Sequence, residues 1–60
     1  MASYRAYFVD ADGHIVSVRI MESRDDAGVL REAEKLVENR DIEIWDGTRL
    51  VHRLSAREER

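Results

Sequence analysis

Apolar and polar residues alternate in two parts of the chain, and a segment with helical spacing separates them. Residues 4–9 and 14–21 are rich in β-branched and aromatic side chains and lie on either side of Asp12-Gly13. Residues 42–54 surround Asp46-Gly47 in a similar way. An Asp-Gly pair between alternating hydrophobic residues is the strongest short-range signal for a β-hairpin. The pattern therefore predicts two hairpins around one helix.

The first hairpin favours the three-residue loop Ala11-Asp12-Gly13, which pairs Asp10 with His14. The opposed residues expected from this loop are Phe8 with Val16, Ala6 with Val18, and Tyr4 with Ile20. All six would share one face, as expected where one face of a sheet is buried. A two-residue loop would pair Phe8 with Ser17 and Ala6 with Arg19, and so mix buried with exposed positions.

For the second hairpin we predict the loop Trp45-Asp46-Gly47, with Glu43 opposite Arg49 as a cross-strand pair of opposite charge. The inner face of this hairpin would be apolar and would hold Ile42, Ile44, Leu50 and Leu54. His52 falls on the same face, where we interpret it as a partly buried side chain near the rim of the sheet.

The segment between the hairpins predicts a helix over residues 25–38. Ser23 or Asp25 is suited to cap its first turn, and Asn39 to end it in a left-handed conformation. Gly28 lowers the helix propensity by up to about 1 kcal/mol relative to alanine. One apolar stripe follows the helical spacing and contains Val29, Leu30, Ala33, Leu36 and Val37.

The order of elements is ββαββ. A right-handed crossover between parallel strands needs one strand between them, which gives the spatial order 2-1-3-4. We therefore expect an α+β fold in two layers, with a four-stranded antiparallel sheet and one helix packed on one face. Residues 1–54 would form a single domain, and residues 55–60 a polar C-terminal tail.

Sixty residues place the chain near the lower size limit for independent folding. Domains of this size commonly add disulfides, a metal or a partner subunit. The chain has no cysteine, and His14 and His52 have no metal-ligand spacing, so self-association is the expected device. A cysteine-free chain without an apolar leader or a membrane span fits a cytoplasmic protein, which is our expectation.

The sheet face away from the helix is the candidate functional surface. Its apolar residues are more than a small monomer normally exposes. Its arginines outnumber its acidic residues although the whole chain carries a net charge of −3. Trp45, at a hairpin tip, adds an aromatic side chain of the kind enriched at binding sites. The predicted interaction surface consists of Arg5, Tyr7, Val9, Ile15, Arg19, Met21, Trp45, Arg49, Val51 and Arg53.

Motifs for catalysis or metal binding are weak. Asp10-Ala11-Asp12-Gly13-His14 has some resemblance to a calcium loop, but an EF-hand would need a glutamate where Met21 stands. The three glycines are isolated, so no phosphate-binding loop is expected. No serine or threonine is placed beside a histidine by a recognisable motif. We expect no enzymatic activity, no metal and no cofactor.

The chain resembles a group of short uncharacterised bacterial proteins, found mainly in alphaproteobacteria. The shared pattern is YRxYFxDxDGHI, then DDxxAL, then xExWDG, and it matches residues 4–15 and 42–47 most closely. This resemblance carries no activity across. The chain departs from the pattern at Gly28 and Val29, where the group has Glu-Ala. A weaker similarity is to HicB-type antitoxin domains, but their proline- and glycine-containing segment is missing here.

Two functions remain open from the sequence. The first is a small non-catalytic protein–protein interaction or regulatory module that self-associates, with a dimer as the expected form, or binds another protein. The alternative is a nucleic-acid-binding or antitoxin-like regulator that uses the arginines of the outer face. The net charge of −3 argues against nucleic acid, and the aromatic signature of RNA-binding sheets is missing.

Overall fold

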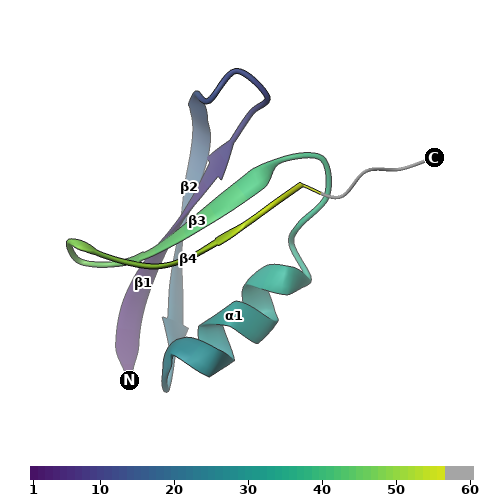
Figure 1. Cartoon of the computed structure of the whole chain (residues 1–60). Helices are drawn as coiled ribbons and strands as arrows, with labels where there is room; N and C mark the ends of the chain where they lie inside the picture. The colour runs from purple at the N-terminus through teal and green to yellow at the C-terminus, as the bar shows by residue number, and fades with distance from the viewer. Residues whose placement is uncertain (57–60) are drawn as a thin grey trace.

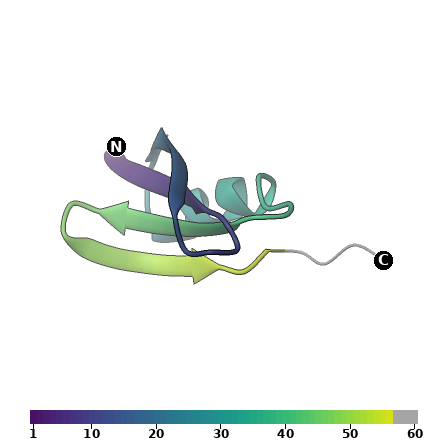
Figure 2. The same ribbon diagram turned by 90° about the horizontal axis from the view of Figure 1, so that it is seen from above.

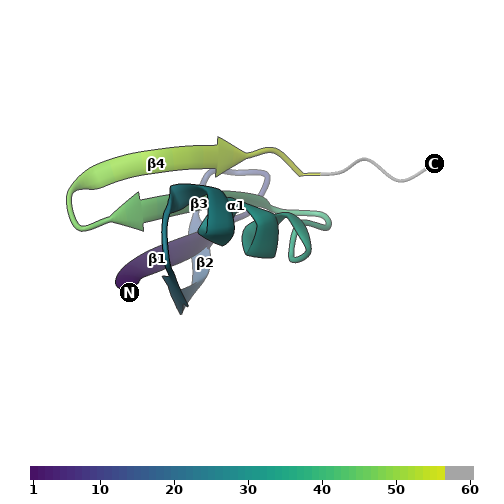
Figure 3. The ribbon, with the colours of Figure 1, turned by 90° about the horizontal axis from the view of Figure 1, so that it is seen from below.

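The computed structural model describes residues 1–56, which form a four-stranded antiparallel sheet and one helix (Figure 1). The elements are β1 (Ala2–Val9), β2 (Ile15–Ser23), α1 (Asp26–Glu34), β3 (Asp41–Asp46) and β4 (Arg49–Leu54). The strand order is β2-β1-β3-β4, which confirms the predicted ββαββ fold. The helix lies behind the strands in Figure 2 and in front of them in Figure 3, so it covers one face of the sheet.

Of the predicted tail, residues 57–60 lie outside the described part of the chain. Ala56 is held against β3, because its backbone N–H donates to Oδ1 of Asp41 over 2.7 Å. The described chain therefore continues along the sheet for at least two residues beyond β4.

The loop of the first hairpin is the predicted one. The N–H of Asp10 donates to the carbonyl of His14 over 2.9 Å, and the N–H of Gly13 donates to the carbonyl of Asp10 over 3.0 Å. Gly13 has φ +85°, a conformation that a side chain with a Cβ rarely adopts. The carboxylate of Asp10 accepts the N–H groups of Asp12 and His14 at 3.0 and 2.9 Å. This carboxylate closes the turn in the way typical of aspartate.

The register beyond this loop differs from the prediction, because a β-bulge follows the turn. Val9 lies opposite Ile15, but Phe8 lies opposite Ser17, which leaves Val16 as an extra residue. The pairs farther from the turn are Tyr7 with Val18, Ala6 with Arg19, Arg5 with Ile20, and Tyr4 with Met21. The predicted pairing of Phe8, Ala6 and Tyr4 with Val16, Val18 and Ile20 is therefore wrong by one residue, which places β2 with its other face toward the helix.

The second hairpin has a shorter loop than predicted. Asp46 lies opposite Arg49, so Gly47 and Thr48 form a two-residue turn. Gly47 has φ +62° and Thr48 has no positive φ, a combination that matches a type II′ turn. A second bulge leaves Val51 unpaired, because Trp45 lies opposite Leu50 and Ile44 lies opposite His52. The predicted pair Glu43–Arg49 is wrong, since Glu43 lies opposite Arg53.

Helix α1 begins as predicted and ends earlier. The side chain of Asp25 accepts the N–H of Gly28 over 2.9 Å, so Asp25 is the N-cap. The helix ends at Glu34, four residues before the predicted end. The N–H of Lys35 donates to the carbonyl of Glu32 over 3.2 Å, a spacing typical of a tighter final turn.

The predicted left-handed terminator at Asn39 is wrong, because no non-glycine residue among residues 1–56 has a positive φ. Gly28 leaves room for the side chain of Ser23, because a Cβ built at position 28 would lie 2.4 Å from Oγ of Ser23. Helix α1, the helix of the described chain, is not long and apolar enough to cross a membrane.

The core lies between α1 and the two central strands. Its buried residues are Tyr4, Ala6, Val29, Ala33, Val37, Ile42 and Ile44. The nine residues of α1 span about 14 Å at 1.5 Å per residue, whereas the nine residues of β2 span about 30 Å. The helix is therefore too short to cover the whole inner face of β2. The inner positions of β2 that the helix does not cover need not be apolar. Ser17 and Arg19 occupy two of the inner positions of β2.

Candidate interaction surface

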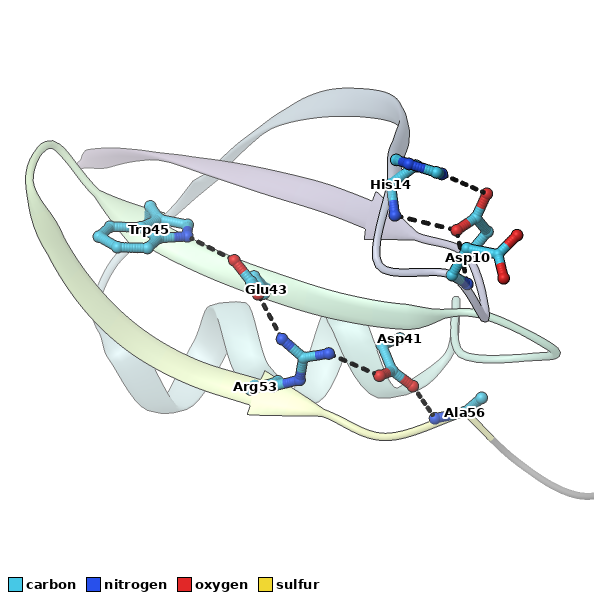
Figure 4. A network of polar contacts seen from close by, with 8 residues as sticks. Asp10, His14, Asp41, Glu43, Trp45, Arg53 and Ala56 are labelled. Atoms are coloured by element: carbon cyan, nitrogen blue, oxygen red, sulfur yellow. Dashed lines mark hydrogen bonds and ion pairs between the residues drawn. The ribbon is translucent and has the colours of Figure 1, made fainter.

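We call the sheet face opposite α1 the outer face. Side chains alternate along each strand, so the residues opposed across the sheet define its members. Figure 4 views this face, with the helix behind the sheet and the side chains of Glu43, Trp45 and Arg53 in front. The outer face consists of Arg5, Tyr7, Val9, Ile15, Val18, Ile20, Asp41, Glu43, Trp45, Leu50 and Arg53. Val16 has no opposed residue, and we include it because it is exposed and precedes Ser17, an inner residue.

Strand β2 supplies most of the exposed apolar surface of this face. Every residue from Ile15 to Ile20 is exposed. The exposed fractions are 61% for Ile15, 45% for Val16, 54% for Val18 and 60% for Ile20. Leu50 on β4 adds a fifth large apolar side chain, 48% exposed. Exposed apolar residues gathered on one face of so small a domain are typical of an interaction site.

Four predicted surface residues do not lie on the outer face. Arg19 and Met21 are opposite Ala6 and Tyr4, and the bulge in β2 therefore turns both toward the helix side. Met21 packs against the core, and Arg19 lines an open hollow of about 540 Å³ beside α1.

On β4, Val51 is the extra residue of the second bulge and packs against the core. Arg49 is opposite Asp46 and forms an ion pair with Asp26 of the helix. The assignment of both residues to the outer face was wrong, but the cause differs from that on β2. The turn is one residue shorter than predicted, which reverses the sides of Arg49 and Leu50, and the extra residue Val51 then returns His52, Arg53 and Leu54 to their predicted sides.

Val9 lies on the outer face as predicted but is only 4% exposed. It is opposite Ile15 and Asp41 and lines a hollow of about 280 Å³ with Arg53 and Ala56. A charge at Val9 would therefore destabilise a single chain, whether or not the face binds a partner. The exposed apolar centre of the surface lies on β2 instead.

Tyr7 and Trp45 lie on the outer face, as predicted from the sequence. Both are partly buried, and they line an open groove of about 410 Å³ together with Ile15, Glu43 and the Gly47-Thr48 turn. The indole N–H of Trp45 donates to Oε1 of Glu43 over 3.2 Å, which holds the ring along β3 (Figure 4). The arrangement offers two partly buried aromatic side chains beside the apolar row of β2.

The outer face is less basic than the sequence predicts. Arg53 donates to Oδ2 of Asp41 over 2.8 Å and also forms an ion pair with Glu43. The N–H of Ala56 and then Arg53 lower the pKa of Asp41 below its ordinary value. Because Arg19 and Arg49 lie on the helix side, Arg5 is the one outer-face arginine within residues 1–56 that has no ion pair.

Arg49 belongs to a cluster that ties the helix to the sheet. Its guanidinium donates to both oxygens of Asp26 at 3.2 and 3.3 Å, and to Asp46 at 3.1 Å. The hydroxyl of Tyr4 donates to the same Asp26 carboxylate over 2.8 Å. Arg49 and then Tyr4 lower the pKa of Asp26, and the hydrogen bond to Asp26 raises the pKa of Tyr4. These residues have a structural explanation and are not free to bind a ligand.

Asp10, Asp12 and His14 bring three candidate metal-ligand atoms within 4.8 Å of one another. The Asp10 carboxylate already accepts two backbone N–H groups, and its second oxygen is 4.0 Å from Nδ1 of His14 (Figure 4). The N–H of His14 and that of Asp12 lower the pKa of Asp10. The turn accounts for the position of this cluster, so we assign it no metal.

Sequence reasoning placed Val16, Val18 and Ile20 in the core and therefore missed the residues that dominate the exposed surface. It also placed Leu50 inside. Their alternation with Ser17 and Arg19 is visible in the sequence, but alternation alone does not say which side faces the helix. His52 lies on the inner side opposite Ile44 as predicted, yet it is exposed rather than partly buried.

Comparisons of the chain with protein-family models, with curated proteins and with solved structures found no match.

Proposed function

We propose that this protein is a small non-catalytic protein–protein interaction or regulatory module that self-associates through its outer face. The observation that carries the proposal is the exposed apolar row on β2, where Ile15, Val16, Val18 and Ile20 are each 45–61% exposed. Removing such side chains from water is favourable, at about 25 cal/mol for each Å² of apolar surface. A chain of 60 residues with a small core gains stability from covering them.

The rim of this surface also suits a protein partner. Tyr7 and Trp45 provide aromatic contacts beside the apolar row, and Arg5 provides a charge at its border. Interfaces between proteins are enriched in aromatic residues and arginine around an apolar centre. A dimer is the simplest closed assembly for such a surface. A cytoplasmic location is the sequence-based expectation that accompanies this proposal.

Sedimentation equilibrium of the wild-type chain at micromolar concentrations tests the proposal. We expect a mass above that of one chain, and a single-chain mass for Ile20→Lys, which places a charge in the exposed row. Asn39→Lys adds the same charge at an exposed position between α1 and β3, and should leave the mass unchanged. A wild-type monomer at every concentration that also captures no partner in an affinity experiment would contradict the proposal.

The alternative function, binding of nucleic acid through the arginines, has less support. Of the four predicted basic contacts on the sheet, Arg49 and Arg53 are each paired with two carboxylates, and Arg19 lies on the other side. Phosphate binding by Lys and Arg weakens steeply with salt because counterions are released. An electrophoretic mobility shift that disappears between low and physiological salt would support the alternative. We expect no shift at either concentration.

A further inference from the structure

Strand β2 is an edge of the sheet, and the backbone groups on its open side pair with no strand within residues 1–56. Natural edge strands are usually short or bear charges and bulges, because an open edge is a template for pairing with another chain. The other edge, β4, has six residues, a bulge, and the charged residues Arg49 and Arg53. Strand β2 has nine residues, its bulge lies near its first residue, at Val16, and from Val16 to Ile20 its only charged residue is Arg19.

We propose that β2 of a second copy pairs with this edge in antiparallel orientation about a twofold axis at Val18. The two sheets then form one continuous sheet of eight strands. The apolar rows of the two outer faces meet across the junction. This inference rests on the proposed function, since it names the partner and the way in which that same surface receives it.

The residues of β2 favour this register. In a regular antiparallel pair related by a twofold axis, opposed residues lie on the same face. With Val18 at the centre, Ser17 is opposite Arg19 of the second copy, and Val16, the extra residue of the bulge, is opposite Ile20 at the end of the paired segment. Six β-branched side chains then form one row on the outer face, with valine and isoleucine pairs that stabilise a sheet. Each Arg19 lies beside a small polar residue and opposite no cation.

Neighbouring registers are less favourable. With Arg19 at the centre, the two Arg19 guanidinium groups are directly opposed, which is destabilising. With Ile20 at the centre, Val18 is opposite the charged Glu22. With Ser17 at the centre, the bulge at Val16 lies next to the axis, and the outer-face residue Ile15 would be opposite Arg19 of the inner side. The charges and the strand geometry therefore favour the register centred on Val18. Because β2 opposes itself favourably in this register, a second copy of this chain is the partner that fits the edge.

The absence of cysteine from the sequence allows a direct test by cross-linking. Residues directly opposed in an antiparallel pair have Cα atoms about 4.5–5.5 Å apart, within the range that a disulfide spans. Val18→Cys should therefore form a covalent dimer under mild oxidation. Two copies of Ile20→Cys should not, because four residues along the strand separate these positions by about 13 Å. We expect about tenfold more covalent dimer for Val18→Cys than for Ile20→Cys, in line with these distances.

A mixture of two variants makes the register test stricter. Val16→Cys mixed with Ile20→Cys should form a mixed dimer that neither forms alone. Opposed pairs alternate between hydrogen-bonded and non-hydrogen-bonded geometry, so Ser17→Cys mixed with Arg19→Cys tests the second kind. Leu50→Cys is the matched control, because Leu50 lies on the outer face but on β4, at the opposite edge of the sheet from β2. It would form a dimer if two outer faces stack on each other or if two β4 edges pair, but not if two β2 edges pair.

The outcomes distinguish the inference from the proposed function. Cross-linking at Val18, together with the two mixed pairs, supports the edge-paired dimer. A wild-type dimer in which none of these variants cross-links, or in which Leu50→Cys cross-links instead, would overturn the edge pairing and leave the proposed function standing. A chain that remains single at every concentration and captures no partner would overturn both.

Discussion

The hydroxyl of Tyr4 on β1 donates a hydrogen bond of 2.8 Å to the carboxylate of Asp26, the first residue of α1. Tyr4 is only 3% exposed, so the contact joins the core to the start of the helix. Asp26 also receives Arg49 from β4. One carboxylate therefore links three elements on the helix side of the sheet, and it couples the ionisation of two side chains to the fold.

Tyr4 should ionise above the ordinary range for tyrosine, because the hydrogen bond to Asp26 raises its pKa. The Tyr7→Phe variant leaves Tyr4 as the single tyrosine of the chain. We expect the tyrosinate absorbance of this variant to appear at a pH above 10.0, the value ordinary for tyrosine. Replacing Asp26 by asparagine should move the transition to a lower pH. An unchanged transition in the Asp26→Asn background would contradict the assigned cause.

Acid should destabilise the fold partly through Asp26. Arg49 and Tyr4 lower its pKa in the folded chain, so the unfolded chain takes up the proton first as the pH falls. The stabilisation is complete above the unfolded pKa of about 3.9 and is lost as the pH falls through the lower folded pKa. Asp10 and Asp41 act in the same direction.

Urea unfolding at several pH values measures this contribution. We expect wild type to be more stable than Asp26→Asn at neutral pH, and the difference to shrink as the pH falls below the ordinary aspartate pKa. A difference that stays constant from neutral to acidic pH would show that the carboxylate contributes only by its shape.

The two turns predict strong effects of substitution at their glycines. Gly13 and Gly47 have φ +85° and +62°, and a β-branched residue is strained there. Gly13→Val and Gly47→Val should each lower the free energy of unfolding by more than about 1 kcal/mol. Asparagine tolerates the left-handed conformation, so Gly13→Asn should cost less than Gly13→Val. Equal unfolding midpoints for wild type and both valine variants would mean that these turns are assigned wrongly.

Alanine substitutions distinguish the observed register of β2 from the one expected from sequence. Ile42 is fully buried, so Ile42→Ala should lower the free energy of unfolding by about 2–5 kcal/mol. Ile20 is 60% exposed, and Ile20→Ala should cost no more than about 0.5 kcal/mol in a dilute solution of single chains. A loss at Ile20 as large as that at Ile42 would instead favour the register in which Ile20 faces the core.

The sequence was sufficient for the order of elements, the strand order and the first turn, because Asp-Gly pairs and helical spacing are local signals. It was not sufficient for the faces of β2 and β4. Val16 and Val51 are extra residues at bulges, and no local feature of the sequence announces them. Since side chains alternate along a strand, the extra residue in β2 moved the residues beyond it to the opposite side. In β4 the shorter turn reversed Arg49 and Leu50, and the extra residue Val51 returned the residues beyond it to their predicted sides. Met21 and Val51 thus joined the core, and Val18 and Ile20 became exposed.

The predicted basic character of the outer face failed for a second reason. Arginines can be counted in the sequence, but their partners lie far along the chain. Arg53 is twelve residues from Asp41, and Arg49 is twenty-three residues from Asp26. These pairings exist only after the strands and the helix have come together. The face is apolar as expected, but of the apolar residues of β2 predicted for it, Ile15 lies there and Met21 does not; Val16, Val18 and Ile20 supply the rest.

The melting temperature of wild type across a hundredfold dilution series tests the central claim, that the apolar row of β2 is a surface for association. An assembly gains stability from protomer concentration, so the wild-type melting temperature should fall on dilution. Ile20→Lys should melt at one temperature throughout, near the value that wild type reaches when dilute, because Ile20 contributes little to a single chain. A wild-type melting temperature independent of concentration and equal to that of Ile20→Lys would contradict the claim and leave β2 a solvent-exposed edge.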